Sequence, residues 1–308
     1  SASGMAAIYT SFMALLKSGD HIVSCSSVFG ATHALFTKYF PKLNISHSYF
    51  NIKDPNSIEK LIKSETRFIY LETPTNPAIE LIDLEFVAAI AKKHNKLLIV
   101  DNCFATPYLQ QPIKFGADLV IHSATKYMDG QGRVLGGVVV GKKELIREIY
   151  LYGRLTGPSL SPFNAWTLSK SLETLTIRMD KHCENALAVA EALEKNSALE
   201  NVSYPFLKSH PHYAIAKKQM KAGGGIITIT VKGGYEAAKK FMDKLQMIKI
   251  SPNLGDVRSI ATHPASSTHC KLSEEERLSV GITPGLIRIS IGLEHKDDIL
   301  NDIEQALK

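Results

Sequence analysis

The chain has 308 residues, of which 44% are hydrophobic and 21% are charged. This composition is typical of a globular protein and excludes disordered and fibrous classes. The 36 basic and 30 acidic side chains give a formal charge of +6. Because the basic residues are interleaved with acidic ones, we predict no nucleic-acid partner. At about 100–200 residues per domain, the length predicts two domains.

The chain carries no signal for a membrane or for secretion. Its longest apolar runs, such as Leu97–Val100, are far too short to span a bilayer, and no signal peptide opens the chain. The four cysteines form no CxxC pair, which fits a reducing compartment, so we expect a cytoplasmic protein with no metal and no membrane partner. Because Ser1 stands where a Met would be, we expect a processed or truncated chain.

In the first half of the chain, short β-rich runs alternate with amphipathic helical patterns. Asp54 followed by Pro55 predicts one helix start, and Asp83 predicts another. The alternation predicts an α/β fold with a mostly parallel sheet flanked by helices. The runs predicted as buried strands are His21–Ser24, Arg67–Leu71, Leu97–Val100, Leu119–His122 and Gly137–Val140.

The pattern changes after Ser161. A long helical stretch is predicted from Pro162 into the 190s, and further strands and helices follow it. They predict a smaller C-terminal α+β domain, with the boundary inside the long helix, near residue 178. The expected domains are therefore 1–178 and 179–308. The later elements are strands Ile226–Val231 and Leu286–Ile291 and helices Tyr235–Leu245 and Asp297–Leu307.

Two predicted strands end in ionisable groups. Asp101 follows the run Leu97–Val100, and Lys126 follows Leu119–His122 within a Ser-Ala-Thr-Lys run. Ligands of open parallel sheets bind beyond the carboxyl ends of the strands. By position alone, Asp101 and Lys126 are as consistent with a structural ion pair as with a catalytic site.

Several groups around Lys126 are suited to a phosphate. The hydroxyls of Ser123 and Thr125 can both donate to one phosphate, and Gly4 stands at a predicted helix start whose N–H groups favour an anion. No GxGxxG run opens a helix, so a dinucleotide site is not expected. A lysine, a carboxylate for a ring nitrogen and a separate phosphate site are what pyridoxal 5'-phosphate (PLP) requires.

Six runs in order along the whole chain resemble those of the Cys/Met-metabolism family of PLP enzymes. That family includes cystathionine γ-synthase, methionine γ-lyase and the homoserine-ester sulfhydrylases. The runs are Ser3-Gly4-Met5, Glu72-Thr73-Pro74-Thr75-Asn76-Pro77, Asp101-Asn102-Cys103-Phe104-Ala105-Thr106-Pro107, Ser123-Ala124-Thr125-Lys126-Tyr127, His263-Pro264-Ala265 and Arg288-Ile289-Ser290-Ile291-Gly292-Leu293.

The resemblance implies a role for each matching residue. Lys126 is expected to bind PLP covalently and to move protons, and Arg288 to bind the substrate α-carboxylate through its planar fork of donors. The other implied contacts to the cofactor are Asp101 to the ring nitrogen, Asn76 to the phenolic oxygen, and Ser123, Thr125 and the backbone of Gly4 and Met5 to the phosphate.

The chain also departs from much of the family. Phe29 stands where many members have Tyr, so it can stack on the cofactor ring but has no phenol for acid–base chemistry. Asn253 begins the run Asn253-Leu254-Gly255-Asp256, at a place where the lyase members of the family look more like Ser-Leu-Gly. With the segment 129–137, these features most resemble the O-succinylhomoserine sulfhydrylase branch. Arg133 either meets the second carboxylate of a succinyl group or lies in a surface turn.

The resemblance implies a PLP-dependent transferase. It would replace the acyl group of an O-acylhomoserine, expected to be O-succinylhomoserine, with sulfide and give homocysteine for methionine synthesis. The alternatives are a cystathionine γ-synthase or methionine γ-lyase, or a catalytically incompetent fragment that serves as an assembly partner. The last alternative arises because no N-terminal arm precedes Ser1, whereas the family's arm lends a Tyr and an Arg to a neighbouring subunit. The resemblance also implies a homotetramer with active sites shared between subunits.

Overall fold

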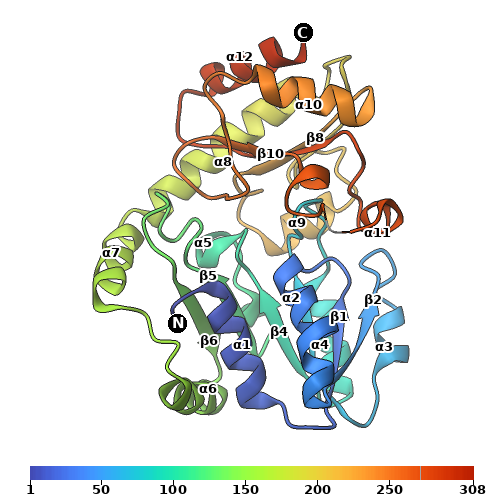
Figure 1. The fold of residues 1–308 in the computed structure, drawn as a ribbon, viewed down its shortest axis with the longest axis vertical. Helices are drawn as coiled ribbons and strands as arrows, with labels where there is room; N and C mark the ends of the chain where they lie inside the picture. The colour runs from blue at the N-terminus through green and yellow to red at the C-terminus, as the bar shows by residue number, and fades with distance from the viewer. Residues whose placement is uncertain (271) are drawn as a thin grey trace.

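The computed structural model of the protein describes residues 1–270 and 272–308. A six-stranded sheet forms the lower half of the molecule in Figure 1, with the order β2-β1-β3-β4-β5-β6. Its strands are parallel except for β6, which confirms the mostly parallel sheet. The strands are β1 (His21–Cys25), β2 (Ser46–Phe50), β3 (Thr66–Glu72), β4 (Leu97–Asp101), β5 (Leu119–Ser123) and β6 (Gly137–Gly141).

Strand β2 is the one element of this sheet that the apolar runs did not predict. Its sequence, Ser46-His47-Ser48-Tyr49-Phe50, is mostly polar; Ser46 is exposed, the next three residues are partly buried and only Phe50 is buried. It forms an edge of the sheet, where a continuous apolar run is not needed because one side of the strand has no neighbour.

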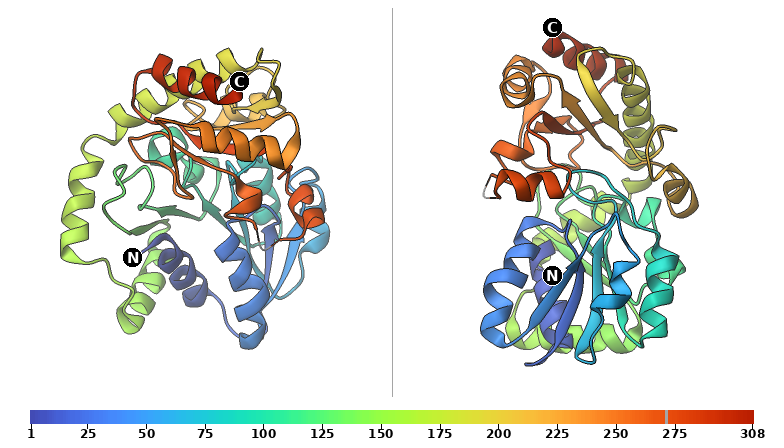
Figure 2. Two further views of the ribbon diagram at one scale, coloured as in Figure 1. Left: turned by 45° about the horizontal axis from the view of Figure 1, so that its top comes forward. Right: turned by 90° about the vertical axis from the view of Figure 1, so that its right-hand side faces the viewer.

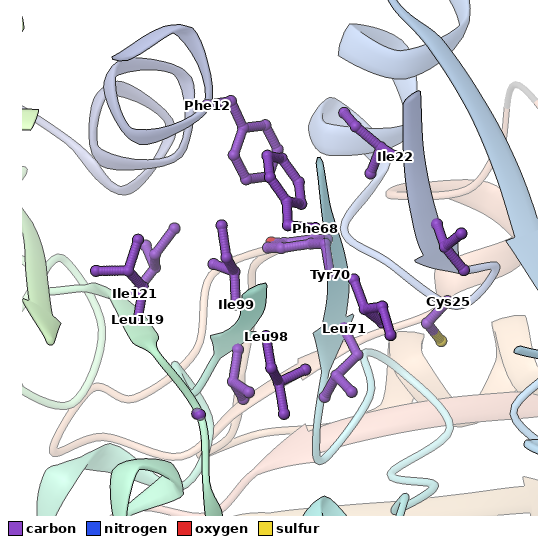
Figure 3. Packing of buried hydrophobic residues seen from close by; sticks show 14 of the residues in the cluster. Phe12, Ile22, Cys25, Phe68, Tyr70, Leu71, Leu98, Ile99, Leu119 and Ile121 are labelled. Carbon is purple, nitrogen blue, oxygen red and sulfur yellow. The ribbon is translucent and has the colours of Figure 1, made fainter. Parts of the chain in front are cut away.

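Helix α1 (Gly4–Leu15) packs across the sheet through aromatic side chains. The ring of Phe12 lies 4.9 Å from that of Phe68 and 5.1 Å from that of Tyr70, between ring centroids, and both partners belong to β3. Figure 3 shows these rings beside the buried side chains of β4 and β5. Edge and tilted ring contacts of this kind add to the burial of apolar area, so α1 is held firmly where its N-terminus meets the end of β5.

A five-stranded sheet forms the upper half, with the order β7-β8-β11-β10-β9. Helices α8 (Leu175–Leu193), α10 (Gly234–Lys244) and α12 (Lys296–Leu307) share a core with it, and Figure 2 shows them gathered at that end of the molecule. The short strands β7, β9 and β10 were not predicted. The strands are β7 (Leu199–Ser203), β8 (Ile226–Val231), β9 (Lys249–Ile250), β10 (Ile260–Thr262) and β11 (Leu286–Ser290).

The prediction of one long helix from Pro162 into the 190s is wrong in one respect, because two helices occupy this stretch. Helix α7 (Pro162–Leu172) ends before Thr174, whose φ of −110° and ψ of 3° leave the helical region. The backbone N–H and hydroxyl of Thr174 both donate to the carbonyl of Ser171. Residue 178 lies near the start of α8, and the division into domains 1–178 and 179–308 stays a prediction.

The helix predicted from Asp54 and Pro55 begins later. Residues 54–57 form a turn in which the hydroxyl of Ser57 donates to the carbonyl of Asp54, and α3 (Ser57–Leu61) follows. The helix predicted after Asp83 is confirmed as α4 (Leu84–Lys93), with the Asp83 side chain accepting from two backbone N–H groups. The other helices are α2 (Gly30–Ala34), α5 (Thr106–Leu109), α6 (Lys143–Thr156), α9 (Tyr213–Gln219) and α11 (Glu274–Ser279).

The length and hydropathy of the helices show whether any of them could cross a membrane. In the described part of the chain, no helix combines the length and the apolar character that crossing a bilayer requires.

Candidate active site

The carboxyl ends of β4 and β5 lie next to each other, as the strand order requires. Asp101 is the last residue of β4 and pairs with Ile121 of β5, and Lys126 follows β5 by three residues. Both side chains therefore belong to the edge of the sheet where parallel strands bind ligands.

Asp101 is a buried carboxylate with few partners. Its side chain accepts the backbone N–H of Cys103 at 3.0 Å and the hydroxyl of Tyr70 at 3.4 Å. The residue is 7% exposed, and this burial raises the pKa of Asp101 to about 6. A protonated ring nitrogen placed against it would stabilise the charged form, because an opposite charge offsets the loss of water.

The amine of Lys126 is held at a defined place. Its Nζ donates to the Oδ1 of Asn253 at 2.5 Å. Burial, and to a lesser extent the charge of Arg288, lower the pKa of Lys126. A lysine with a lowered pKa spends more time as the neutral amine, which is the form that bonds to an aldehyde or accepts a proton.

Arg288 is a cation that lacks an anionic partner. It is 2% exposed, and its guanidinium donates to Asn76 Oδ1 at 2.8 Å and to the carbonyls of Pro252 and Asn253. Its Nε has no hydrogen-bond partner, and it forms no salt bridge among the described residues. Burial lowers the pKa of Arg288 to about 10. An anionic ligand would satisfy this charge, since buried charges are otherwise paired.

The N-terminus of α1 meets the end of β5 at very short range. A Cβ on Gly4 would lie 2.6 Å from the Cβ of Ser123, so only glycine fits there. Ser3 caps the helix through the N–H of Ala6, while the N–H groups of Gly4 and Met5 have no partner in the described part of the chain. Free N–H groups beside a hydroxyl form a phosphate cradle.

The hydroxyl of Thr125 is only partly available to a phosphate in this cradle. Its hydroxyl accepts the N–H of Gly136 at 3.1 Å and lies 3.4 Å from the carbonyl of the same residue. The hydroxyl thus holds the chain as it returns toward β6. It still has a free lone pair and a rotatable proton for a phosphate.

Phe29 and Glu72 lie on the other side of Asp101. Phe29 is 42% exposed and precedes α2, and its backbone N–H donates to Glu72 Oε2 at 3.0 Å. Glu72 ends β3 and pairs in register with Asp101. The sequence interpretation assigned Glu72 no role, although the residue ends a buried strand in a carboxylate as Asp101 does.

Arg133 is exposed and directly follows a bend of the chain, as one of its two interpretations expects. Its guanidinium donates to the buried carboxylate of Asp129 at 3.0 and 3.2 Å and to the hydroxyl of Ser171. The Asp129 carboxylate also accepts the backbone N–H groups of Gln131 and Arg133 and the hydroxyl of Ser171. Arg133 is thus a partner of Asp129 in this structure, and binding of a succinyl carboxylate by Arg133 stays a prediction.

The remaining residues fit PLP. A lysine with a lowered pKa, a buried carboxylate and a glycine-lined phosphate cradle lie at one edge of the sheet, and Arg288 offers an unpaired cation across from them. Among the described residues, the Nε of Arg288 has no hydrogen-bond partner, and burial raises the pKa of Asp101 to about 6. Both become satisfied if a pyridinium and a carboxylate-bearing substrate bind.

Comparison with known proteins agrees with this fit. The chain is 47% identical over 306 residues to an O-succinylhomoserine sulfhydrylase of Pseudomonas aeruginosa, covering 99% of the chain and 76% of that protein. It is 44% identical to an L-methionine gamma-lyase of Treponema denticola, covering 99% of the chain and 77% of that protein. A crystal structure of cystathionine gamma-lyase from Lactobacillus plantarum complexed with L-serine matches with a TM-score of 0.95 at 36% identity, covering 99% of the chain and 80% of that structure. The Cys/Met metabolism PLP-dependent enzyme family matches residues 1–308, and the chain belongs to this family.

Proposed function

We propose that this enzyme replaces the acyl group of O-succinylhomoserine with sulfide and gives homocysteine for methionine synthesis. The 47% identity to an O-succinylhomoserine sulfhydrylase supports this choice. The observation that carries it is Phe29, a partly exposed aromatic residue without a hydroxyl whose backbone N–H donates to Glu72, the strand neighbour of Asp101.

Arg288 and Asn253 would orient the substrate. The Nε of Arg288 has no hydrogen-bond partner among the described residues, whereas its terminal nitrogens donate to Asn76 and to two backbone carbonyls. A substrate carboxylate would accept from Nε and offset the buried charge. Asn253 carries both the amide that contacts Lys126 and a carbonyl that contacts Arg288. The substrate α-carboxylate would therefore be fixed beside the amine that acts on the neighbouring carbon.

Lys126 would take the proton from the substrate Cα at its Nζ. When PLP is bound, it supplies an electron sink for the pair left on that carbon. Burial lowers the pKa of Lys126 below its ordinary value, so a larger fraction of this amine is in the neutral, basic form than in an exposed lysine. The same Nζ would be neutral again once it had passed this proton on to the bound cofactor, and it could then remove a proton from Cβ while the γ-substituent leaves with its bonding electrons.

The nature of that leaving group depends on Phe29. A carboxylate is a weak base and leaves without a proton, whereas a thiolate, with a pKa near that of cysteine, gains more from an acid beside it. Phe29 has no proton to give. An ester of homoserine therefore suits this site better than the thioether of methionine or cystathionine.

The second candidate is a lyase or a cystathionine γ-synthase. The 44% identity to an L-methionine gamma-lyase favours the former. These enzymes share the first proton transfers and differ in the later steps, since a lyase releases an oxo acid and the synthase adds cysteine. The product formed with sulfide, with cysteine and with neither one separates the three activities.

The test is an assay of the purified, PLP-loaded protein with O-succinylhomoserine. We expect homocysteine when sulfide is added and little oxo acid from methionine. Rapid oxo-acid release from methionine would instead establish a lyase, and cystathionine formed from cysteine in preference to homocysteine would establish the synthase. A protein that binds no PLP and forms no product would leave only the non-enzyme alternative, an assembly partner.

The substitution Phe29→Tyr tests the reason for this specificity. We expect the added phenol to raise elimination from methionine by about 10-fold or more and to leave turnover of the ester nearly unchanged. Leu35→Tyr, on the helical segment after α2, is the control for adding a phenol nearby without placing it against the site. Unchanged activity with methionine would show that the missing hydroxyl does not set the specificity.

We also propose a homotetramer in the cytoplasm with active sites shared between subunits. Helices α6 and α7 expose large apolar side chains, including Leu155, Phe163 and Trp166, and α7 stands away from the body of the molecule in Figures 1 and 2. An apolar surface of this kind is typical of an interface. All four cysteines are free, as expected in a reducing compartment. Light scattering after gel filtration should give four times the mass of the chain, and a single-chain mass would contradict the assembly.

A further inference from the structure

Two buried carboxyl groups end neighbouring strands at the floor of the site. Glu72 of β3 and Asp101 of β4 are partners in a parallel register, so their side chains point to the same face of the sheet. They are 4% and 7% exposed. The positive charge of Arg288 acts on Glu72, but the two form no salt bridge in the described part of the chain.

Two such groups cannot both ionise at moderate pH. Each negative charge raises the proton affinity of the other, and burial adds to the effect. Burial and the charge of Asp101 raise the pKa of Glu72 well above its ordinary value. A protonated ring nitrogen against Asp101 would hold the negative charge there, and the proton of the pair would then belong on Glu72.

Glu72 also fixes the residue at the entrance of the site. Its Oε2 accepts the backbone N–H of Phe29 at 3.0 Å, and the contact joins residues 43 positions apart. Phe29 precedes the first turn of α2 and has no side-chain cap. The carboxyl oxygen of Glu72 is thus the tie between the floor of the sheet and the aromatic ring that faces the cofactor.

We propose that Glu72 is a positioning residue for PLP, a neutral carboxylic acid that holds Phe29 over the cofactor ring and leaves the one negative charge of the pair on Asp101. This inference rests on the proposed roles of Asp101 and Phe29. It assigns Glu72 two tasks that can be separated: to accept the N–H of Phe29, which any carbonyl oxygen can do, and to carry no charge. A glutamine side chain has the oxygen and no charge, whereas an alanine side chain has neither the oxygen nor a charge.

The experiment compares Glu72→Gln and Glu72→Ala in the PLP-dependent enzyme, with Glu80→Gln as the control. Glu80 is also a partly buried carboxyl whose pKa burial raises, but its ion-pair partner is Lys53. The measurements are the dissociation constant of PLP from titration of the cofactor-free protein, the visible circular dichroism of bound PLP, and the pH dependence of its absorbance. The last two report the orientation and the proton balance of the cofactor without any turnover.

We expect Glu72→Gln to match the wild type in affinity, in circular dichroism and in the pH at which the visible band changes. We expect Glu72→Ala to weaken PLP binding by about 10-fold and to reduce the circular dichroism, because Phe29 is no longer held. A Glu72→Ala protein with wild-type affinity and circular dichroism would overturn the positioning role.

If the Glu72→Ala protein does not fold, the Glu72→Gln protein still tests the proposal. A shift in the pH dependence of the visible band in Glu72→Gln would show that Glu72 is ionised in the wild type, which contradicts the neutral acid. A wild-type protein that binds no PLP would instead refute the proposed function itself. The two failures are thus distinguished by the wild-type titration.

Discussion

The active site is built from two walls that differ in origin and in charge. The sheet wall consists of the ends of β3, β4 and β5, with Glu72, Asp101 and Ser123. The opposite wall consists of Arg288 on β11 and the loop that carries Asn253. The walls meet through contacts of long range, since Arg288 and Asn76 are 212 positions apart and Lys126 and Asn253 are 127 apart.

The difference in charge between the two walls indicates which wall suits the cofactor and which suits the substrate. The sheet wall holds two buried carboxyl groups and a phosphate cradle, whereas the opposite wall holds a buried cation with a free donor. A pyridinium with a phosphate complements the first, and a carboxylate complements the second. Changes in the sheet wall should therefore affect the cofactor, and changes in the opposite wall should affect the substrate.

The largest effect is expected at Lys126, which joins the two walls. Lys126→Ala removes the proposed attachment point and the proposed base, so we expect kcat to fall about 10⁴-fold or more and the visible absorption of the bound cofactor to change. Lys170→Ala is the control, because Lys170 is exposed and pairs with Glu173. An active Lys126→Ala protein would contradict the proposed chemistry.

The second-largest effect is expected at Arg288, and it separates the binding of the substrate from the binding of the cofactor. Arg288→Lys replaces a planar fork with a single ammonium, and we expect a loss of about 10- to 100-fold in kcat/KM, mostly through KM. The PLP spectrum and affinity should stay as in the wild type. Arg258→Lys, at an exposed arginine paired with Asp256, is the control. Loss of PLP binding in Arg288→Lys would contradict the division between the walls.

A smaller effect is expected at the phosphate cradle. Gly4→Ala places a Cβ 2.6 Å from the Cβ of Ser123, so α1 and β5 must move apart, and we expect PLP to bind about 10-fold more weakly. Gly30→Ala is a matched control, because Gly30 also opens a helix and a Cβ there meets nothing within 4 Å. Equal affinities in the two variants would mean that the close approach does not form the cradle.

The smallest effect concerns the stability of the cofactor-free protein. Because burial raises the pKa of Asp101 to about 6, the folded state binds this proton more tightly than the unfolded state. This contribution to stability is present below about pH 4 and is lost as the pH rises through about 6. Urea unfolding should show that Asp101→Asn loses less stability than the wild type over this range. Parallel pH profiles would contradict the raised pKa.

The parts of the site that could be predicted are those that depend on local sequence. A strand of apolar residues ends where polar residues begin, so Asp101 and Lys126 could be placed at strand ends. Parallel strands share one carboxyl edge, which accounts for their proximity. A glycine after Ser3 predicted the start of α1 in the same way.

The parts that could not be predicted depend on contacts between distant segments. The break between α7 and α8 arises because the carbonyl of Ser171 bonds to Thr174 and to the guanidinium of Arg178, while the apolar pattern continues across it. The pairing of Arg133 with Asp129 is another case, since the same sequence is consistent with an exposed turn. Such side-chain partners leave no periodic signal.

The sequence by itself determined the α/β class, the mostly parallel character of the sheet and the residue types at the ends of its buried strands, because strand propensity and apolar periodicity are local properties. Only the tertiary structure decided that Glu72 lies beside Asp101 and accepts the N–H of Phe29, and that Arg288 is buried with an Nε that finds no partner among the described residues. Burial and pairing are properties of the packed molecule. They set the proton affinities on which the chemistry of this site depends.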